Sequence, residues 1–211
     1  MNINDLRINY SKSSIDFDDL ISDPKELFKV WFNDALSLKI NEPNAFVLST
    51  VSNQNTPSSR VVLLKEVSNN GFVFFTNYLS KKSKEIEDNP FVSLNFYWPD
   101  LEKQVRITGK AIKISRAESE KYFKTRPTKS KIGAVISNQS NEISFDFCFD
   151  NEIKKNKAKF ENSSIPCPDN WGGYCVFPLS YEFWQGRPSR LHDRLSYTLI
   201  DDVWKIKRLS P

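Results

Sequence analysis

The sole histidine of this 211-residue chain lies in a cluster of arginines near its C-terminal end. His192 stands in the run WQGRPSRLHDRLSY, and Arg187, Arg190 and Arg194 fall within eight positions around it. If RLHDRLSY is a strand, its period of two places Arg190, His192 and Arg194 on one face. Guanidinium groups present a fork of donors to a phosphate or an electron-rich ring, and an imidazole can donate or accept. The cluster indicates either a binding surface for an anionic, planar ligand or a solvated strand face.

A second basic set occurs in the run RVVLLK, where Arg60 and Lys65 bracket the four apolar residues 61–64. Such an apolar run is typical of a strand buried on both faces. Its charged ends then lie at the rim of the fold, where ligands bind. The alternative interpretation is that the two charges only mark where the strand leaves the core.

A third set suits a phosphate group. In TNYLSKKSKE, Lys81 and Lys82 stand at the expected start of a helix. Free backbone N–H groups there, with the hydroxyls of Thr76 and Ser80, could complete a phosphate cradle. No glycine-rich Walker pattern is present, so a nucleoside triphosphate loop is not indicated. The alternative is a lysine pair on a solvated helix face.

A fourth set occupies KYFKTRPTKS. Tyr122 and Arg126 are one helical turn apart, and Pro127 ends the helix so that Ser130 can turn toward the same space. A phenol, a guanidinium and a hydroxyl together suit a phosphate ester.

Amide, hydroxyl and indole groups that could bind the edge of a heterocycle occur at Gln104, in the NQS run at 138–140, and at Trp184 and Gln185. Each also has a structural interpretation: an exposed strand residue, a turn, or an aromatic core anchor.

The elements that must position these groups follow from periodicity and capping signals. Asp23, Pro24 and Glu26 predict the start of a helix with a capping box, and Ser115 with Glu118 predicts a second capping box. Apolar spacing then predicts helices near 24–38, 80–90, 117–126, 130–137 and 145–160, and strands at 45–51, 58–67, 71–77, 91–98, 103–115, 174–186, 190–200 and 203–209. Strands with interspersed small helices and no regular βαβ alternation predict a mainly β fold with helices, an antiparallel barrel.

Composition bounds the class of protein. The length and 39% hydrophobic content favour one domain at 21–211, with residues 1–20 as a flexible arm that covers the active site. Three cysteines without C-x-x-C spacing and one histidine argue against a disulfide framework or a metal site. A net charge of +4 from scattered basic residues does not indicate nucleic acid. Neither a membrane span nor a secretory signal is indicated, so we expect a cytoplasmic protein.

The order and spacing of these runs resemble the pyridoxine (pyridoxamine) 5′-phosphate oxidase family. The resemblance extends from about Arg60 to Pro211 through RVVLLK, FFTN-x-x-SKK, EKQVRITG, YFKTRP-x-x-S-x-IGA, NQS, WGGY, EFWQG-x-x-x-RLHDR and WKIKRLSP. The pairing of EFWQG with RLHDR is the most specific motif. Arg7 and Tyr10 in RINY fall where the family has an R-x-x-Y segment that covers the substrate.

The resemblance implies an antiparallel, FMN-binding split β-barrel that forms a homodimer, with FMN at the subunit interface. By motif position, the residues expected to line FMN are Arg60, Val61, Val62, Leu63, Leu64, Lys65, Phe75, Thr76, Lys81, Lys82, Gln104, Gln139, Ser140, Trp184 and Arg194. Those expected to bind substrate are Arg7, Tyr10, Lys65, Tyr122, Arg126, Ser130, Arg190 and His192, the last two as catalytic residues.

The activity implied is the oxidation of pyridoxamine or pyridoxine 5′-phosphate to pyridoxal 5′-phosphate, with dioxygen as electron acceptor and release of hydrogen peroxide. Arg190 would clamp the pyridine ring and His192 would bond its polar edge. Two positions depart from the commonest family pattern: Phe75 stands where tyrosine is frequent, and Lys81 where arginine is frequent. These changes bear on FMN affinity rather than on the type of reaction.

Two alternatives remain open at this point. One is a different FMN-dependent oxidoreductase on the same barrel, which is expected to lack the YFKTRP and RLHDR sets together. The other is a non-catalytic binder of a flavin, a B6 phosphate or nucleic acid, which would explain the basic residues without turnover.

Overall fold

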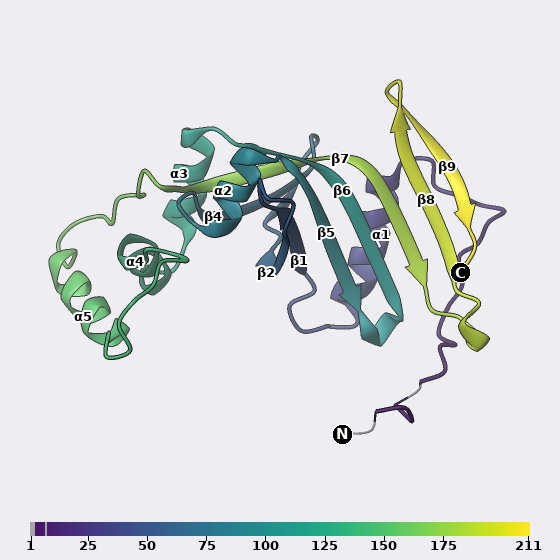
Figure 1. Ribbon diagram of the computed structural model, residues 1–211, viewed down its shortest axis with the longest axis horizontal. Coiled ribbons are helices and arrows are strands. Elements are labelled where there is room, and N and C mark those ends of the chain that lie inside the picture. The colour runs from purple at the N-terminus through teal and green to yellow at the C-terminus, as the bar shows by residue number, and fades with distance from the viewer. Residues whose placement is uncertain (1–2, 7) are drawn as a thin grey trace.

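The chain folds as a curved antiparallel sheet flanked by helices (Figure 1). This computed structural model describes residues 3–6 and 8–211. In chain order the elements are α1 (Pro24–Ser37), β1 (Ala45–Val51), β2 (Pro57–Leu63), β3 (Glu66–Val67), β4 (Phe72–Asn77), α2 (Lys81–Asp88), β5 (Phe91–Trp98), η1 (Pro99–Leu101), β6 (Lys103–Lys113), α3 (Arg116–Thr125), α4 (Thr128–Ile136), α5 (Phe149–Lys159), β7 (Trp171–Gln185), η2 (Pro188–Arg190), β8 (Asp193–Ile200) and β9 (Val203–Leu209). No helix in this described part is long and apolar enough to cross a membrane.

The sheet curls into a barrel because one run of chain joins its two edges. The strand order is β2-β1-β5-β6-β7-β4-β3, so that β2 and β3, neighbours in sequence, lie at opposite ends of the order. The predicted strand 58–67 is therefore two strands, which pair with β1 and β4 respectively. The change of partner falls at Leu64 and Lys65: Leu64 N–H bonds Asn44 O at 2.8 Å, and Lys65 N–H bonds Val73 O at 2.9 Å. This bend places Lys65 at the rim of the barrel.

The long strand β7 divides the sheet. On one side it pairs with β6, and on the other with β4 at its start and with β8 at its end. Pro178 lies between these two partners, where a missing backbone N–H removes no ladder hydrogen bond. Opposite it, the register with β6 shifts between Thr108 and Gly109. A Cβ on Gly109 would lie 2.2 Å from Phe177 O, so only glycine allows this approach.

Helix α1 covers the open side of the sheet with aromatic side chains. The Phe28 ring centroid lies 4.9 Å from that of Phe72 and 5.0 Å from that of Phe96, and Trp31 lies 5.2 Å from Phe183. All of these rings are buried, and each contributes about 1.5–3 kcal/mol to stability.

The start of α1 confirms one predicted cap and corrects another. Asp23 accepts the N–H of Lys25 at 2.8 Å, and Pro24 follows at the first position. Glu26, however, forms no capping box: its carboxylate pairs with Lys29, one turn along, at 2.7 Å. At α3 the predicted capping box of Ser115 is present.

The strand predicted at 190–200 begins only at Asp193. Pro188 starts a short 3₁₀ turn in which Ser189 and Arg190 have φ angles of 55° and 62°. Arg190 and His192 therefore precede the strand and do not alternate with Arg194 along one face. Backbone in the left-handed region is costly for residues other than glycine and is concentrated at functional sites.

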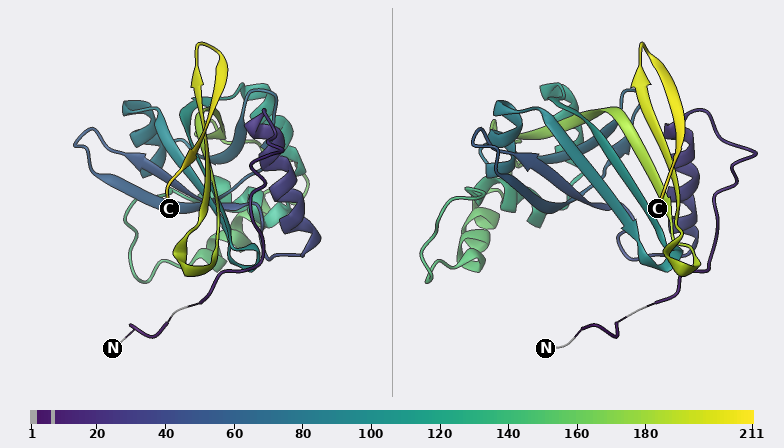
Figure 2. Two further views of the ribbon diagram at one scale, coloured as in Figure 1. Left: turned by 90° about the vertical axis from the view of Figure 1, so that its right-hand side faces the viewer. Right: turned by 45° about the vertical axis from the view of Figure 1, so that its right-hand side comes forward.

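The N-terminal segment, residues 8–23, lies against the part of the sheet that contains β8 (Figure 2). It contains neither helix nor strand between residues 8 and 23. The N–H of Ile15 bonds Asp193 at 3.2 Å, and the Tyr197 hydroxyl donates to Ile21 O at 2.7 Å. Predicted site residue Arg7 lies outside the described residues, and the flexibility of residues 1–20 remains a prediction.

Candidate functional site

A cavity of about 680 Å³ lies between the barrel rim, α3 and α4. It brings together residues predicted from four separate runs of the sequence. The predicted residues that line it are Val61, Val62, Leu63, Lys65, Phe75, Thr76, Lys82, Tyr122, Arg126, Ser130 and Gln139. Groups expected to contact the cofactor and groups expected to contact the substrate thus share one space.

Lys82 places a buried ammonium group in this cavity. Its Nζ donates to Thr76 Oγ1 at 3.1 Å, Gln139 Oε1 at 3.1 Å and Ser80 Oγ at 3.2 Å, all of them neutral acceptors. No ion pair of Lys82 with a carboxylate is found in the described residues. Burial, reinforced by the nearby charge of Arg60, lowers the pKa of Lys82 to about 8. A buried cation held only by neutral groups is suited to an anionic ligand.

Behind Lys82, a buried carboxylate orders the neighbouring cations. Glu85 accepts hydrogen bonds from Thr50 Oγ1 at 2.5 Å and Ser58 Oγ at 2.7 Å, and pairs with Lys81. Burial raises its pKa, but these hydrogen bonds outweigh that effect and lower the pKa to about 2. Arg60 lies 3.4 Å from this carboxylate. Glu85 therefore stays ionised and draws Lys81 and Arg60 toward itself rather than into the cavity.

Arg126 supplies the second cation of the cavity. Its guanidinium lies 4.7 Å from the centre of the Trp171 ring and 5.6 Å from that of Phe123. Its Nη1 is buried and has no hydrogen-bond partner among residues 3–6 and 8–211, and burial lowers the pKa of the group. An unpaired buried donor of this kind costs about 1–3 kcal/mol until a ligand satisfies it.

Aromatic rings form one wall beside these cations. Phe75 stacks on Tyr122 with centroids 4.0 Å apart and on Trp171 with centroids 5.3 Å apart. The phenylalanine at position 75 thus keeps the stacking that an aromatic residue provides, while it lacks a hydroxyl. Such a wall suits a flat ring ligand.

The donor set in this cavity fits a phosphorylated cofactor such as FMN. The Lys82 ammonium has only neutral acceptors, and Arg126 Nη1 has none. Phosphate oxygens would supply the missing charge and the missing acceptor. Lys82, Thr76 and Gln139 would hold the phosphate of the cofactor, which leaves Arg126 and Ser130 for a second phosphate in the same cavity.

A second cluster of predicted residues lies at the opposite end of the sheet. Trp184 and His192 have ring centroids 4.6 Å apart, and the Tyr10 ring lies 5.6 Å from each of them. Gln104 and Arg194 stand on the strands beside Trp184, in register with it. Three neighbouring strands and the N-terminal segment therefore build this cluster.

Arg194 and Arg190, in the second cluster, differ in whether other residues already bind their side chains. Arg194 is held by Glu182, with Nη2 2.9 Å from Oε1, and donates to Ser210 O at 2.7 Å. Arg190 is exposed, and no ion pair is found for it among the residues described. Only Arg190 is free to close on a ligand.

The two clusters cannot meet within one chain. Trp171 and Trp184 lie at the two ends of β7. At about 3.3 Å per residue, the strand between them is about 40 Å long. Figure 1 shows the start of β7 beside α3 and its other end beside β8, on opposite sides of the molecule.

The remaining predicted residues lie outside the cavity. Leu64 is buried in the core. Lys81 is exposed on α2, and Arg60 donates to Thr50 Oγ1 at 2.6 Å. Ser140 is exposed, with a φ of 74°. Their roles at a cofactor remain predictions.

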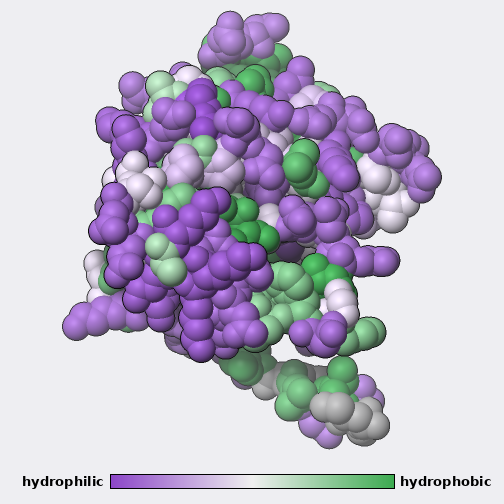
Figure 3. Space-filling model, turned by 90° about the vertical axis from the view of Figure 1, so that its left-hand side faces the viewer, coloured by the Kyte–Doolittle hydropathy of each residue, from purple (hydrophilic) through white to green (hydrophobic). Residues whose placement is uncertain are grey.

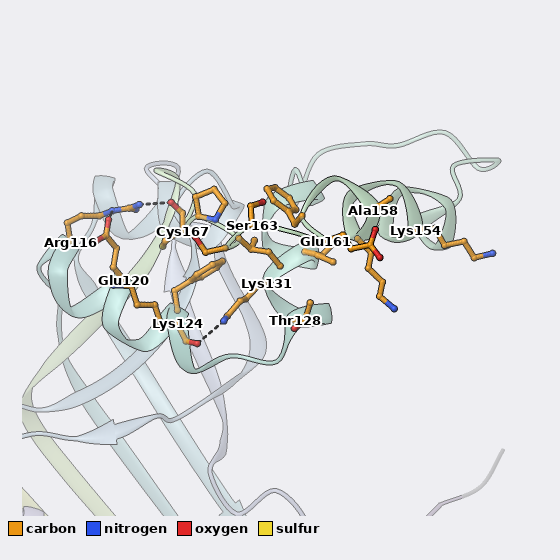
Figure 4. A pocket seen from close by; sticks show the side chains of 17 residues that line it. Arg116, Glu120, Lys124, Thr128, Lys131, Lys154, Ala158, Glu161, Ser163 and Cys167 are labelled. Atoms are coloured by element: carbon orange, nitrogen blue, oxygen red, sulfur yellow. Dashed lines mark hydrogen bonds and ion pairs between the residues drawn. The ribbon is translucent and has the colours of Figure 1, made fainter.

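A larger cavity, of about 970 Å³, lies between α3, α4, α5 and residues 160–167 (Figure 4). No predicted site residue lines it, and Lys154 points away from the other lining side chains. Arg116 at its edge is already bonded, to Cys167 O at 2.6 Å and Glu120 at 2.8 Å. The surface at this end of the molecule is mostly hydrophilic (Figure 3). The cavity of about 680 Å³ is the better candidate because, among the residues described, neither Lys82 nor Arg126 has a carboxylate partner.

Sequence reasoning missed several residues that line the site. Trp171 stacks on the aromatic wall, and Asn77 donates to Ser137 O at 3.1 Å, which holds the chain after α4. Glu85, which lies behind the cavity and pairs with Lys81, was also missed. The WGGY run contained a signal for Trp171, whereas a lone glutamate on a charged helix carries none.

The fold and the site together define a class: a split-barrel protein with an anion-binding cavity at the rim. Among solved structures, PhzG from Burkholderia lata in complex with tetrahydrophenazine-1-carboxylic acid has a TM-score of 0.89 and is 28% identical, over 95% of this chain and 100% of that one. An FMN binding protein of Nostoc punctiforme, related to pyridoxamine 5′-phosphate oxidase, has a TM-score of 0.72 at 15% identity, over 91% and 100% of the two chains, and supports the fold alone.

The sequence comparisons are more specific. A family model described as pyridoxamine 5′-phosphate oxidase matches residues 32–149, and one described as the pyridoxine 5′-phosphate oxidase C-terminal dimerisation region matches residues 171–211. The pyridoxine/pyridoxamine 5′-phosphate oxidases of Rippkaea orientalis and Haemophilus influenzae are 51% and 49% identical, each over 100% of both chains. The chain belongs to the pyridoxamine 5′-phosphate oxidase family. The predicted resemblance, fold class and enzyme class, an oxidoreductase, are confirmed.

Proposed function

We propose that this protein is an FMN-dependent oxidase that converts pyridoxine or pyridoxamine 5′-phosphate to pyridoxal 5′-phosphate. Pyridoxine 5′-phosphate and dioxygen give pyridoxal 5′-phosphate and hydrogen peroxide. The pyridoxamine ester consumes a water in addition and releases ammonia. The reaction belongs to vitamin B6 biosynthesis and salvage, and we expect it in the cytoplasm. Relatives of this name that match the chain over its whole length support the assignment.

The observation that carries the proposal is that one cavity contains the buried Lys82 ammonium and the half-buried Arg126 guanidinium. Lys82 is bonded only to neutral groups, and Arg126 Nη1 is unpaired. FMN and the B6 ester each bring a phosphate with a charge of about −1.5 to −2. Each charge-assisted hydrogen bond contributes about 1.5–3 kcal/mol, so two or three per phosphate supply a useful part of micromolar binding, about 8 kcal/mol.

The second cluster requires a homodimer. Arg190 and His192 follow the end of β7 that is remote from the cavity of their own chain. A second copy that lays its β7 end against the cavity would bring these residues to the substrate. The match of residues 171–211 to a dimerisation region supports this arrangement.

In the completed site, the roles follow motif position and chemistry. Lys65, Tyr122, Arg126 and Ser130 would hold the phosphate of the substrate, while Arg190 of the second copy closes over its ring. When bound, FMN supplies a two-electron acceptor for the C4′ carbon that dioxygen can reoxidise. The protein contributes orientation, charge neutralisation and exclusion of water.

His192 is arranged to act in its neutral form. Its Nδ1 accepts the N–H of Arg187 at 3.1 Å, which leaves the proton on Nε2. Burial is the main cause that lowers the pKa of His192, and the nearby positive charge of Arg190 lowers it further. Neutral His192 can then donate from Nε2 to the polar edge of the substrate.

Anaerobic addition of pyridoxamine 5′-phosphate to the purified protein tests the proposal. We expect a yellow protein whose flavin absorbance bleaches with substrate and returns with air, with release of peroxide. A yellow protein that does not bleach would be a binder rather than an oxidase, and a colourless one that cannot be loaded with FMN would refute the cofactor. Arg190→Met and His192→Ala should lose turnover but keep flavin, while Lys205→Met on exposed β9 serves as the control.

A further inference from the structure

A buried carboxylate in the turn between β5 and β6 holds the N-terminal segment. Glu102 is 5% exposed, and its Oε2 accepts the N–H of Ser11 at 2.8 Å and of Lys12 at 2.9 Å. No ion pair of Glu102 is found within the described residues. Its charge is therefore satisfied by two backbone donors from residues about ninety positions away in the chain.

The position of Glu102 is rigidly connected to the second cluster. Its carbonyl accepts the N–H of Gly186 at 2.7 Å and Nε2 of Gln185 at 3.2 Å. Its φ is 53°, in the left-handed region that disfavours residues with a Cβ. A buried charge on costly backbone is a feature that proteins retain at functional positions.

The carboxylate fixes the residue that precedes its donors. Tyr10 comes just before Ser11, and its ring lies 5.6 Å from both Trp184 and His192. The ring also lies directly on Gly186, since a Cβ there would be 2.7 Å from Tyr10 Cγ. Glu102 and Gly186 thus both position Tyr10. Glu102 bonds the two backbone N–H groups that follow it, and Gly186 has no side chain and so leaves room for its ring.

Other bonds hold the segment farther along. Arg187 donates to Ser13 O at 3.0 Å, and Ile15 N–H bonds Asp193 at 3.2 Å. These bonds lie three or more residues from Tyr10, so they tether the segment without setting its ring. Glu102 holds the two backbone N–H groups that directly follow Tyr10, while the Tyr10 side chain is also hydrogen-bonded to Tyr97.

We propose that Glu102 is a positioning residue for substrate binding: by fastening residues 11 and 12, it sets the Tyr10 ring against Trp184 and His192. This inference rests on the proposed function, in which Tyr10 binds the substrate. Glu102 touches neither substrate nor cofactor and acts through the segment alone.

The test compares Glu102→Gln with Asp100→Asn in the flavin-loaded dimer. The glutamine keeps the shape and removes the charge; Asp100 lies in the same turn, and its carbonyl, not its carboxylate, accepts Lys12 Nζ. For Glu102→Gln we expect the KM for pyridoxamine 5′-phosphate to rise about tenfold, the change that about 1.4 kcal/mol produces. We expect kcat and flavin content to change little, and trypsin to cleave after Lys12 about tenfold faster. Asp100→Asn should resemble the unmodified protein in all four measurements.

A double-mutant cycle separates positioning from general stability. If Glu102 acts through Tyr10, Glu102→Gln should have almost no further effect on KM in a Tyr10→Ala background. Should Glu102→Gln fail to fold, Ser11→Pro removes one donor N–H and leaves the carboxylate intact, with the same expected rise in KM. Unchanged KM and trypsin sensitivity, or additive effects in the cycle, would overturn the inference. Failure of the unmodified protein to oxidise the substrate would overturn the proposed function instead, and the trypsin comparison would still decide whether Glu102 holds the segment.

Discussion

Replacement of Lys82 by methionine separates the requirements of folding from those of ligand binding. Lys82 is 9% exposed, and the hydrogen-bond partners of its ammonium group within the described part of the chain are all neutral. We expect the Lys82→Met protein without flavin to be more stable than the unmodified protein, and its affinity for FMN to be lower. A residue that served stability would show the opposite pattern in the first measurement.

The magnitude follows from the shifted pKa. The pKa of Lys82 falls from 10.5 to about 8 on folding, and each unit corresponds to 1.36 kcal/mol. At pH 7 the buried charge therefore costs about 3 kcal/mol relative to a neutral amine. Thr76 Oγ1 donates to Gln139 Oε1 at 3.2 Å, and this bond does not involve Lys82. The substitution therefore leaves few of the former Lys82 acceptors without a hydrogen-bond partner. We expect a gain of about 1–3 kcal/mol in the free energy of unfolding.

The shifted pKa of Lys82 also predicts how the free energy of unfolding changes with pH. Between pH 8 and 10.5 the unfolded chain binds the proton and the folded chain does not, so stability rises with pH across this range. The cost of the charge is fully present below pH 8 and is relieved as the pH approaches 10.5. The advantage of the Lys82→Met protein should therefore shrink as the pH rises through this window.

Urea denaturation of the flavin-free proteins at several pH values, with a fluorescence titration of FMN, checks both effects. Loss of the charge-assisted bonds should weaken FMN binding about tenfold to 150-fold. Lys84→Met, on the exposed face of the same helix, is the matched control and should change neither quantity. A flavin-free Lys82→Met protein that is less stable at pH 7, or one that binds FMN unchanged, would refute the reasoning.

Three further substitutions test separate features. Glu85→Gln should lower the free energy of unfolding by about 3 kcal/mol at pH 7, because folding lowers the pKa of Glu85 from 4.5 to about 2. The stabilisation by the ionised carboxylate is complete above pH 4.5 and is lost as the pH falls to about 2, which urea denaturation across this range would measure. Gly109→Ala should cost about 3 kcal/mol, since its Cβ would lie 2.2 Å from Phe177 O, and an unchanged Tm would contradict the close approach. For His192, whose pKa is lowered below 6.5, stability should fall as the pH drops below that value, and His192→Gln should remove this loss in thermal unfolding followed between about pH 5 and 7.

Much of the fold follows from local pattern. Period-two runs located the strands, and the Asp23 cap and the Ser115 capping box located two helix starts, because these signals depend on residues within a few positions of each other. The errors occur where distant contacts override the pattern. The run 58–67 looks like one strand, yet it bends at Lys65 because its two halves pair with β1 and β4.

For the candidate site too, some features could be predicted from the sequence and others could not. The residue types, their order and their resemblance to an oxidase family were readable from the sequence, since they are properties of the chain as written. Period two could not place Arg190 and His192, because the turn at Ser189 decides their direction. Similarly, nothing in SKKSKE distinguishes Lys82 from Lys81, although one lies buried in the cavity and the other is exposed.

The sequence by itself therefore determined which groups are available for chemistry and which short elements carry them. The tertiary structure alone decided which of those groups lose contact with water and which distant segments meet. Lys82 and Arg126 come together in one cavity only when α2, α3 and the barrel rim enclose them. The two clusters end at opposite ends of β7 because that strand runs the full length of the sheet. Burial and long-range distance arise from packing between remote parts of the chain, which no local pattern of residues records.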